Sequence, residues 1–158
     1  MIARLFRGLH EAGVLGMNNR NAEVIMARNP RSLFPLVDNK VVTKELAALS
    51  DIPTPELYGV IAKHGDIRQF ESIIRDRDSF ALKPARGSGG SGIVLVKEKG
   101  ETGLVTESGR TITIPDLRYH ITDILSGIFS LEGQDDQAII EALIHPHDVF
   151  AAVTYRGV

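Results

Sequence analysis

Residues 80–94 read FALKPARGSGGSGIV, and this stretch decides how the rest of the sequence is interpreted. From Gly87 to Gly92 every residue is Gly or Ser, so the segment offers few side chains to a core while its ordering costs backbone entropy. Its physical use is to let main-chain N–H groups approach an anion closely, since a Cβ would obstruct them. Lys83 comes just before the loop on an expected strand, where its ammonium would be held beside it. The pattern therefore predicts a site for a phosphate chain.

Three nucleotide-binding motifs compete for this loop. The spacing Gly87-x-Gly89-x-x-Gly92 matches the dinucleotide fingerprint, but that motif must open a helix, whereas strand-like residues follow here. With Val94 added, it also matches the glycine loop of protein kinases, but neither His-Arg-Asp nor Asp-Phe-Gly occurs in the chain. A P-loop is excluded because Lys-Ser or Lys-Thr does not follow the last glycine. What remains is a lysine, a strand end and a flexible β-hairpin that folds over phosphates.

The flanking patterns predict both helices and strands. Asp38 or Asn39 is a plausible N-cap for a helix over 40–49. Earlier in the chain we expect a loop at 13–21, a short helix at 21–28 and an extended segment at 31–38. Later we expect strands at 56–61, 80–84, 93–97, 104–106, 111–114 and 138–143, with helices over 65–79 and from Pro115 to about Ser130. This order predicts an α/β (α+β) fold and not a regular doubly wound sheet.

The order of these elements resembles the ATP-grasp superfamily. In that family a lysine in an Asp-Lys segment opens a helix that precedes Ile-Pro-x-Pro, to which Asp38-Asn39-Lys40 and Ile52-Pro53-Thr54-Pro55 are similar. The family's second lysine precedes the glycine hairpin, as Lys83 does. A later strand ends in a hinge that holds the nucleoside, to which 138–143 is similar. The resemblance implies the N-terminal part of an ATP-grasp fold, with a helical N-terminal segment before a small β-rich nucleotide-binding subdomain that carries the glycine-rich hairpin.

Two further stretches narrow the resemblance. Met17-Asn18-Asn19-Arg20-Asn21 and Asn29-Pro30-Arg31 resemble the alpha-L-glutamate ligase-like branch. Enzymes of this branch use ATP and Mg²⁺ to activate a carboxylate as an acyl phosphate, which an amine then attacks, so an amino-acid or peptide substrate is implied for the intact enzyme.

The resemblance also implies roles for single residues. The two lysines would neutralise the α- and β-phosphates of ATP, and the hairpin would close over them. Glu141 and the backbone near the end of the same strand would hold the nucleoside. Glu141 suits this role physically, because a carboxylate in an apolar strand needs donors nearby. The expected nucleotide-binding residues are Lys40, Lys83, Gly87, Ser88, Gly89, Gly90, Ser91, Gly92, Glu141 and Leu143.

The resemblance divides the chain into three parts. Residues 1–79 would form an N-terminal helical segment, 80–143 the ATP-grasp nucleotide-binding subdomain, and 144–158 the start of a C-terminal half. In the family the acidic residues and the asparagine that bind Mg²⁺ follow the hinge, so we expect these ligands outside this chain and assign it no catalytic residue and no metal ligand. The expectation is therefore a fragment of an ATP-dependent carboxylate–amine ligase. The alternative is a non-catalytic nucleotide-binding or interaction module derived from the same fold.

Composition excludes several other classes. The 158 residues carry 18 basic and 20 acidic side chains, and this net charge of -2 argues against a dedicated nucleic-acid binder. The lack of cysteine excludes disulfides and thiolate chemistry. No apolar run approaches the ~18 residues that span a bilayer, so we expect no membrane partner. A chain without cysteine and without a secretory signal fits a cytoplasmic protein. An exposed edge would favour self-association. Asp135-Asp136 and His145-Pro146-His147 are interpreted as a solvated turn and a surface loop, and His120 has no partner that the sequence identifies.

Overall fold

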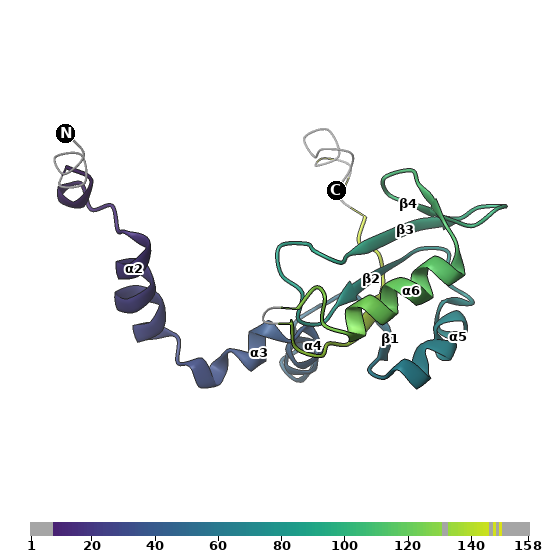
Figure 1. The fold of residues 1–158 in the computed structure, drawn as a ribbon, viewed down its shortest axis with the longest axis horizontal. Coiled ribbons are helices and arrows are strands. Elements are labelled where there is room, and N and C mark those ends of the chain that lie inside the picture. The colour runs from purple at the N-terminus through teal and green to yellow at the C-terminus, as the bar shows by residue number, and fades with distance from the viewer. Residues whose placement is uncertain (1–7, 131–132, 146, 148, 150–158) are drawn as a thin grey trace. The chain divides into compact units, whose positions relative to one another are not determined.

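The computed structural model describes residues 8–130, 133–145, 147 and 149. The chain forms two compact units, one ending at Asp38 and the other beginning at Asn39 (Figure 1). The second unit contains a sheet of six strands in the order β1-β6-β2-β3-β4-β5, in which every neighbouring pair is antiparallel. The strands are β1 (Leu57–Ile61), β2 (Phe80–Pro84), β3 (Val94–Lys99), β4 (Leu104–Thr106), β5 (Thr111–Ile112) and β6 (Ala138–Glu141). The expected mixed helix-and-sheet class is therefore confirmed.

This unit includes the α-helices α4 (Lys40–Leu49), α5 (Phe70–Ile74) and α6 (Ile114–Leu125). The predicted start of α4 is confirmed, because the Asn39 side chain accepts a hydrogen bond from the backbone N–H of Val41 at 2.9 Å. The helix α6 begins with a capping box, in which the side chains of Thr113 and Asp116 each accept a hydrogen bond from the backbone N–H of the other residue.

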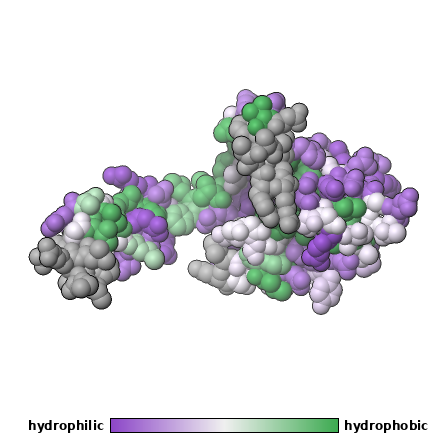
Figure 2. Space-filling view, turned by 90° about the horizontal axis from the view of Figure 1, so that it is seen from above, coloured by the Kyte–Doolittle hydropathy of each residue, from purple (hydrophilic) through white to green (hydrophobic). Residues whose placement is uncertain are grey.

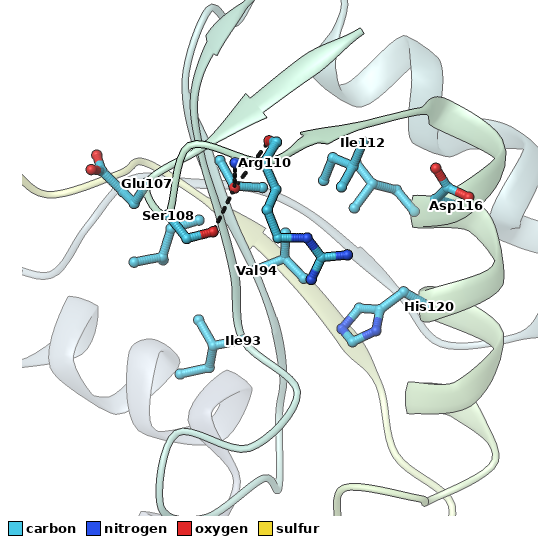
Figure 3. Close-up of a pocket in the computed structure, with 11 residues that line it drawn as sticks. Ile93, Val94, Glu107, Ser108, Arg110, Ile112, Asp116 and His120 are labelled. Atoms are coloured by element: carbon cyan, nitrogen blue, oxygen red, sulfur yellow. Dashed lines mark hydrogen bonds between the residues drawn. The ribbon is translucent and has the colours of Figure 1, made fainter.

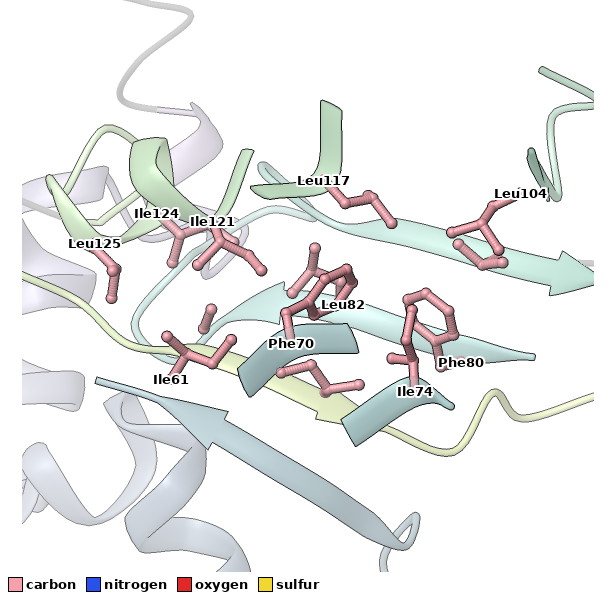
Figure 4. Packing of buried hydrophobic residues seen from close by; sticks show 13 residues of the cluster. Ile61, Phe70, Ile74, Phe80, Leu82, Leu104, Leu117, Ile121, Ile124 and Leu125 are labelled. Carbon is pink, nitrogen blue, oxygen red and sulfur yellow. The ribbon is translucent and has the colours of Figure 1, made fainter. Parts of the chain in front are cut away.

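The core lies between one face of the sheet and the helices α5 and α6. Figure 4 shows the apolar side chains of α6 facing the strands, with Phe70 of α5 beside Phe80 of β2. These two rings meet edge to face at 6.0 Å between centroids. Leu82 also belongs to this core. Because side chains alternate along a strand, Lys83 points to the opposite face of the sheet.

Two predicted helix boundaries are wrong for local reasons. The helix expected over 65–79 is a 3-10 helix (His64–Gln69) followed by the five-residue α5. Beyond α5 the chain runs into Asp76-Arg77-Asp78-Ser79, and Asp and Ser compete with the helix through hydrogen bonds to the backbone. The helix expected to reach Ser130 ends at Leu125, because Gly127 adopts φ +78° and closes the helix in the left-handed conformation.

The end of the strand expected at 111–114 also differs. The strand β5 stops at Ile112, and Thr113 already serves as the N-cap of α6. A threonine side chain suits a strand and an N-cap equally well, so the sequence pattern did not separate the two.

The first unit consists of short helices. They include α2 (Met17–Asn19), a π-helix (Arg20–Met26), a 3-10 helix (Arg31–Leu33) and α3 (Pro35–Asp38). The loop expected at 13–21 and the extended segment expected at 31–38 are therefore wrong in part or whole; Pro35 opens a helix here, since proline is tolerated in the first turn. None of these four helices buries a residue, and Met17 and Val37 are 71% and 69% exposed. Figure 2 shows hydrophobic residues at the surface of this unit. Within the described part of the chain, no helix has both the length and the apolar character needed to cross a bilayer.

Candidate functional site

A buried carboxylate lies between two lysines on the face of the sheet opposite the core. Glu141, the last residue of β6, is 4% exposed. Its Oε1 accepts a hydrogen bond from Nζ of Lys83, and its Oε2 lies 2.7 Å from Nζ of Lys44. The register places Ala81 opposite Glu141, so Lys83 is the diagonal neighbour of Glu141 on the same face. The structure therefore brings together two of the predicted residues, Lys83 and Glu141, and adds Lys44.

The charges of these three side chains do not cancel. A carboxylate buried to this extent needs compensating charge or donors, and Lys83 and Lys44 supply both. The contact of Oε2 with Lys44 is an ion pair without hydrogen-bond geometry, and this oxygen is itself buried. Two ammonium groups against one carboxylate leave one surplus positive charge. The arrangement can therefore attract an anion.

Lys40 lies at the entrance of the glycine loop. Its Nζ donates hydrogen bonds to the carbonyl oxygens of Gly87 at 2.7 Å and Ala85 at 3.2 Å, and its backbone N–H also donates to Ala85 at 3.0 Å. The side chain of Lys44, one helical turn later, instead reaches Glu141. Both lysines lie at i and i+4 of α4, and this spacing was the sequence signal that could have identified Lys44.

Asp136 fixes the strand end from which the glycine loop emerges. Both of its carboxylate oxygens lie 3.0 Å from the backbone N–H of Arg86, and Oδ1 also accepts from the N–H of Gln137 at 2.7 Å. Asp136 is buried, so its interpretation as a solvated turn residue is wrong. The Asp-Asp pair carried no sequence signal for this role, because the contact joins segments 50 residues apart.

The glycine loop connects β2 and β3, which pair as an antiparallel hairpin. At its tip, Ser91 donates a backbone hydrogen bond to Ser88 at 3.1 Å. Gly89 and Gly90 adopt φ +62° and +77°, and no atom lies within 4 Å of the position that a Cβ would take on either. The tip thus presents bare main chain to open space, as the close approach of an anion requires. The predicted glycine hairpin is present.

The last predicted residue, Leu143, follows β6 and is half-buried. Ala142, between β6 and Leu143, donates its backbone N–H to the carbonyl oxygen of Glu56 at 2.8 Å, just before β1. The nucleoside-binding role of Glu141 and Leu143 stays a prediction.

A cavity of about 740 Å³ lies on the other side of the sheet, between α6 and the strands β3 to β5 (Figure 3). It contains none of the predicted site residues. Arg110 points from the β4–β5 turn toward His120 of α6. Hydrogen bonds from the side chain and the backbone of Thr113 lower the pKa of Asp116 at its rim, and the charge of Arg110 lowers it further. The residues that line the cavity are Ile93, Val94, Leu95, Thr106, Glu107, Ser108, Arg110, Ile112, Asp116, Leu117 and His120.

The two candidate positions differ in chemistry. Arg110 is the only lysine or arginine among the cavity's lining residues, which also include Glu107 and Asp116. The opposite face carries the surplus ammonium, beside the strand that leads into the glycine loop. This second position suits a polyphosphate better, so we place the candidate site there and not in the cavity beside α6.

The described residues contain no group of three or more His, Cys, Asp or Glu side chains placed to hold a metal ion. Among known families, the model described as sugar-transfer associated ATP-grasp matches residues 19–158. The match supports the ATP-grasp superfamily expected from the sequence, but it does not support the alpha-L-glutamate ligase-like branch. No curated protein and no solved structure matches the chain.

Proposed function

The chain belongs to the sugar-transfer associated ATP-grasp family, and from this premise we propose that it binds ATP between Lys83 and the glycine hairpin. The observation that carries the proposal is the surplus ammonium charge of Lys83 and Lys44 around Glu141, on the strand that leads into the loop. A triphosphate needs both lysine charge and main-chain N–H groups, and these are the groups that β2 and the loop present together.

Each predicted residue has a distinct part in this proposal. Lys83 neutralises phosphate oxygens, and the main chain of Ser88 to Ser91 closes over them. Lys40 holds the start of the loop through its hydrogen bond to the carbonyl oxygen of Gly87. Its ammonium can bind phosphate only if it gives up this hydrogen bond. Glu141 would contact the ribose or the adenine only by exchanging a lysine partner, because Lys83 and Lys44 lie against its two oxygens.

The proposed reaction class is the activation of a carboxylate as an acyl phosphate for attack by an amine. Mg²⁺ would enter with the nucleotide phosphates, because Mg²⁺ is usually held by few protein carboxylates together with substrate phosphates. We do not assign glutamate as the substrate, and the family description extends the set to be tested to carboxylates and amines carried on saccharides.

A non-catalytic nucleotide-binding module is the second candidate function. The observation behind it is that the described residues offer no cluster of metal ligands. Release of phosphate from ATP and Mg²⁺ in the presence of candidate carboxylates separates the two functions: turnover supports the ligase, and binding without turnover supports the module.

Isothermal titration of the chain with ATP and Mg²⁺ tests the binding site. Lys83→Met keeps the length of the side chain and removes its charge, and we expect a loss of affinity of about 10-fold or more, as for a charge-assisted hydrogen bond. The matched control is Lys97→Met on β3, since Lys97 is 40% exposed and pairs only with its neighbour Glu98. Equal affinity of Lys83→Met and the parent would remove Lys83 from the site.

A further inference from the structure

We propose that His120 and Phe129 are positioning residues that hold one end of the glycine hairpin, while Ser130 holds the other, so that only the four residues of its tip move onto a ligand. The proposal rests on the function proposed above, because it concerns how the same hairpin binds phosphate. It uses contacts on the α6 side of the sheet that the nucleotide itself does not touch.

The C-terminal end of the loop is held at Gly92. Nε2 of His120 lies 2.8 Å from the carbonyl oxygen of Gly92, and because a carbonyl only accepts, Nε2 carries the proton and donates. The ring of Phe129 lies 5.2 Å from the His120 ring, tilted by 44°. A Cβ at Gly92 would lie 2.6 Å from Phe129, and Gly92 has φ +77°. Only glycine therefore fits between this aromatic pair and the loop.

The N-terminal end of the loop is held at Gly87. Gly87 and Ser130 form an antiparallel backbone bridge. The carbonyl of Gly87 also accepts the hydrogen bond from Lys40, and a Cβ at Gly87 would overlap Pro84 at 2.3 Å. Both ends of the loop thus meet neighbouring residues, Phe129 and Ser130, in the turn that follows α6.

This turn is itself fixed. Gly127 has φ +78°, and a Cβ there would lie 2.3 Å from the carbonyl oxygen of Gln134. The hydroxyl of Ser130 donates to the carbonyl of Gly127 at 3.0 Å, and the backbone N–H of Ser130 donates to the same oxygen at 3.1 Å. Phe129 and Ser130 are therefore presented to the loop from a closed turn at the end of a packed helix.

The consequence is a short moving segment. Between its two anchors the loop contains only Ser88, Gly89, Gly90 and Ser91. All four are exposed, and a Cβ at Gly89 or Gly90 would meet no atom within 4 Å. Ordering a residue on binding costs backbone entropy, so an anchor that leaves four residues to order raises affinity relative to a loop that is free along its whole length. His120 would then affect nucleotide affinity without touching the nucleotide.

Two substitutions test separately the hydrogen-bond donor and the aromatic ring of His120. His120→Phe keeps an aromatic ring against Phe129 but has no N–H for Gly92, whereas His120→Gln keeps an N–H donor. The matched control is Tyr119→Phe, since Tyr119 is the preceding residue of α6 and is 72% exposed. Amide hydrogen exchange of residues 87–93 and ATP affinity are measured for each variant.

We expect His120→Phe to speed amide exchange at 87–93 by about 3- to 10-fold and to weaken ATP binding by a similar factor, as for the loss of one hydrogen bond. Exchange at β6 should not change, His120→Gln should recover most of both losses, and Tyr119→Phe should behave as the parent. If His120→Phe does not fold, Phe129→Leu, which loses the ring contact but keeps apolar bulk, replaces it with the same expectation.

Unchanged exchange at 87–93 in the variant that is measured, with ATP still bound by the parent, would overturn the anchor. Faster exchange in a chain whose parent binds no ATP would support the anchor as a structural feature and would overturn the proposed function instead. Loss of ATP binding with no recovery in His120→Gln, and with faster exchange across the whole sheet, would show general destabilisation and would also overturn the anchor.

Discussion

For Glu141, the sequence predicts that the carboxylate needs partners but does not identify all of them. A carboxylate within the apolar run of β6 must find charge or donors, and the sequence allowed that expectation. The sequence did not indicate that Lys44 would reach it and Lys40 would not, because that choice depends on how α4 is placed against the sheet. Local patterns specify which groups need partners, whereas tertiary packing decides which partners they receive.

The ion pairs of Glu141 should contribute to folding stability. Glu141→Gln leaves the ammonium groups of Lys83 and Lys44 without their carboxylate, and we expect the free energy of unfolding to fall by about 3 kcal/mol, as when one partner of a buried pair is removed. Urea denaturation measures this change. The control is Glu56→Gln, whose partner Arg77 is 40% exposed, with an expected loss of at most about 1 kcal/mol. Equal losses in the two variants would contradict the stabilising role of Glu141.

At the scale of helices and strands, the sequence correctly predicts the elements that neighbouring residues determine. The helix α4 with its Asn39 cap, the strand β2 and the glycine hairpin each follow from neighbouring residues. The stop of α6 at Gly127 was also local, and a glycine after an apolar periodic run was a signal for it that the prediction missed. The insertion of β6 between β1 and β2 had no local signal, because it joins strands far apart in the chain.

The capping box of α6 should make stability depend on pH through Asp116. Hydrogen bonds from Thr113 hold the pKa of Asp116 below its ordinary value of 3.8, so the carboxylate stabilises the folded chain above that value, and its contribution is lost as the pH falls through the lowered pKa. Asp116→Asn should therefore be less stable than the parent near neutral pH, and the two should converge as the pH falls below 3.8. Urea midpoints across this range measure the difference.

A matched variant changes Thr113, the partner of Asp116 in the same capping box. Thr113→Ala removes the N-cap hydroxyl, and we expect a loss of about 1 kcal/mol at neutral pH. A difference between Asp116→Asn and the parent that stayed constant, or grew, with falling pH would contradict the assignment.

At the scale of the whole sheet, one face is apolar and packed against helices, whereas the other carries charged side chains. One face packs against α5 and α6 and forms the core, and the cavity near Arg110 lies on this side. The other face carries Lys83 and Glu141 on the neighbouring strands β2 and β6. In our proposals the nucleotide binds this second face, and side chains on the first face anchor the hairpin.

The most direct test of this assignment is a titration of the ¹⁵N-labelled chain with ATP and Mg²⁺, followed by the backbone amide signals. We expect the largest shifts at the amides of Gly87 to Gly92, with smaller changes at Ser108 and Arg110 beside the cavity. Saturable binding that shifts Ser108 and Arg110 while the glycine amides stay in place would contradict it.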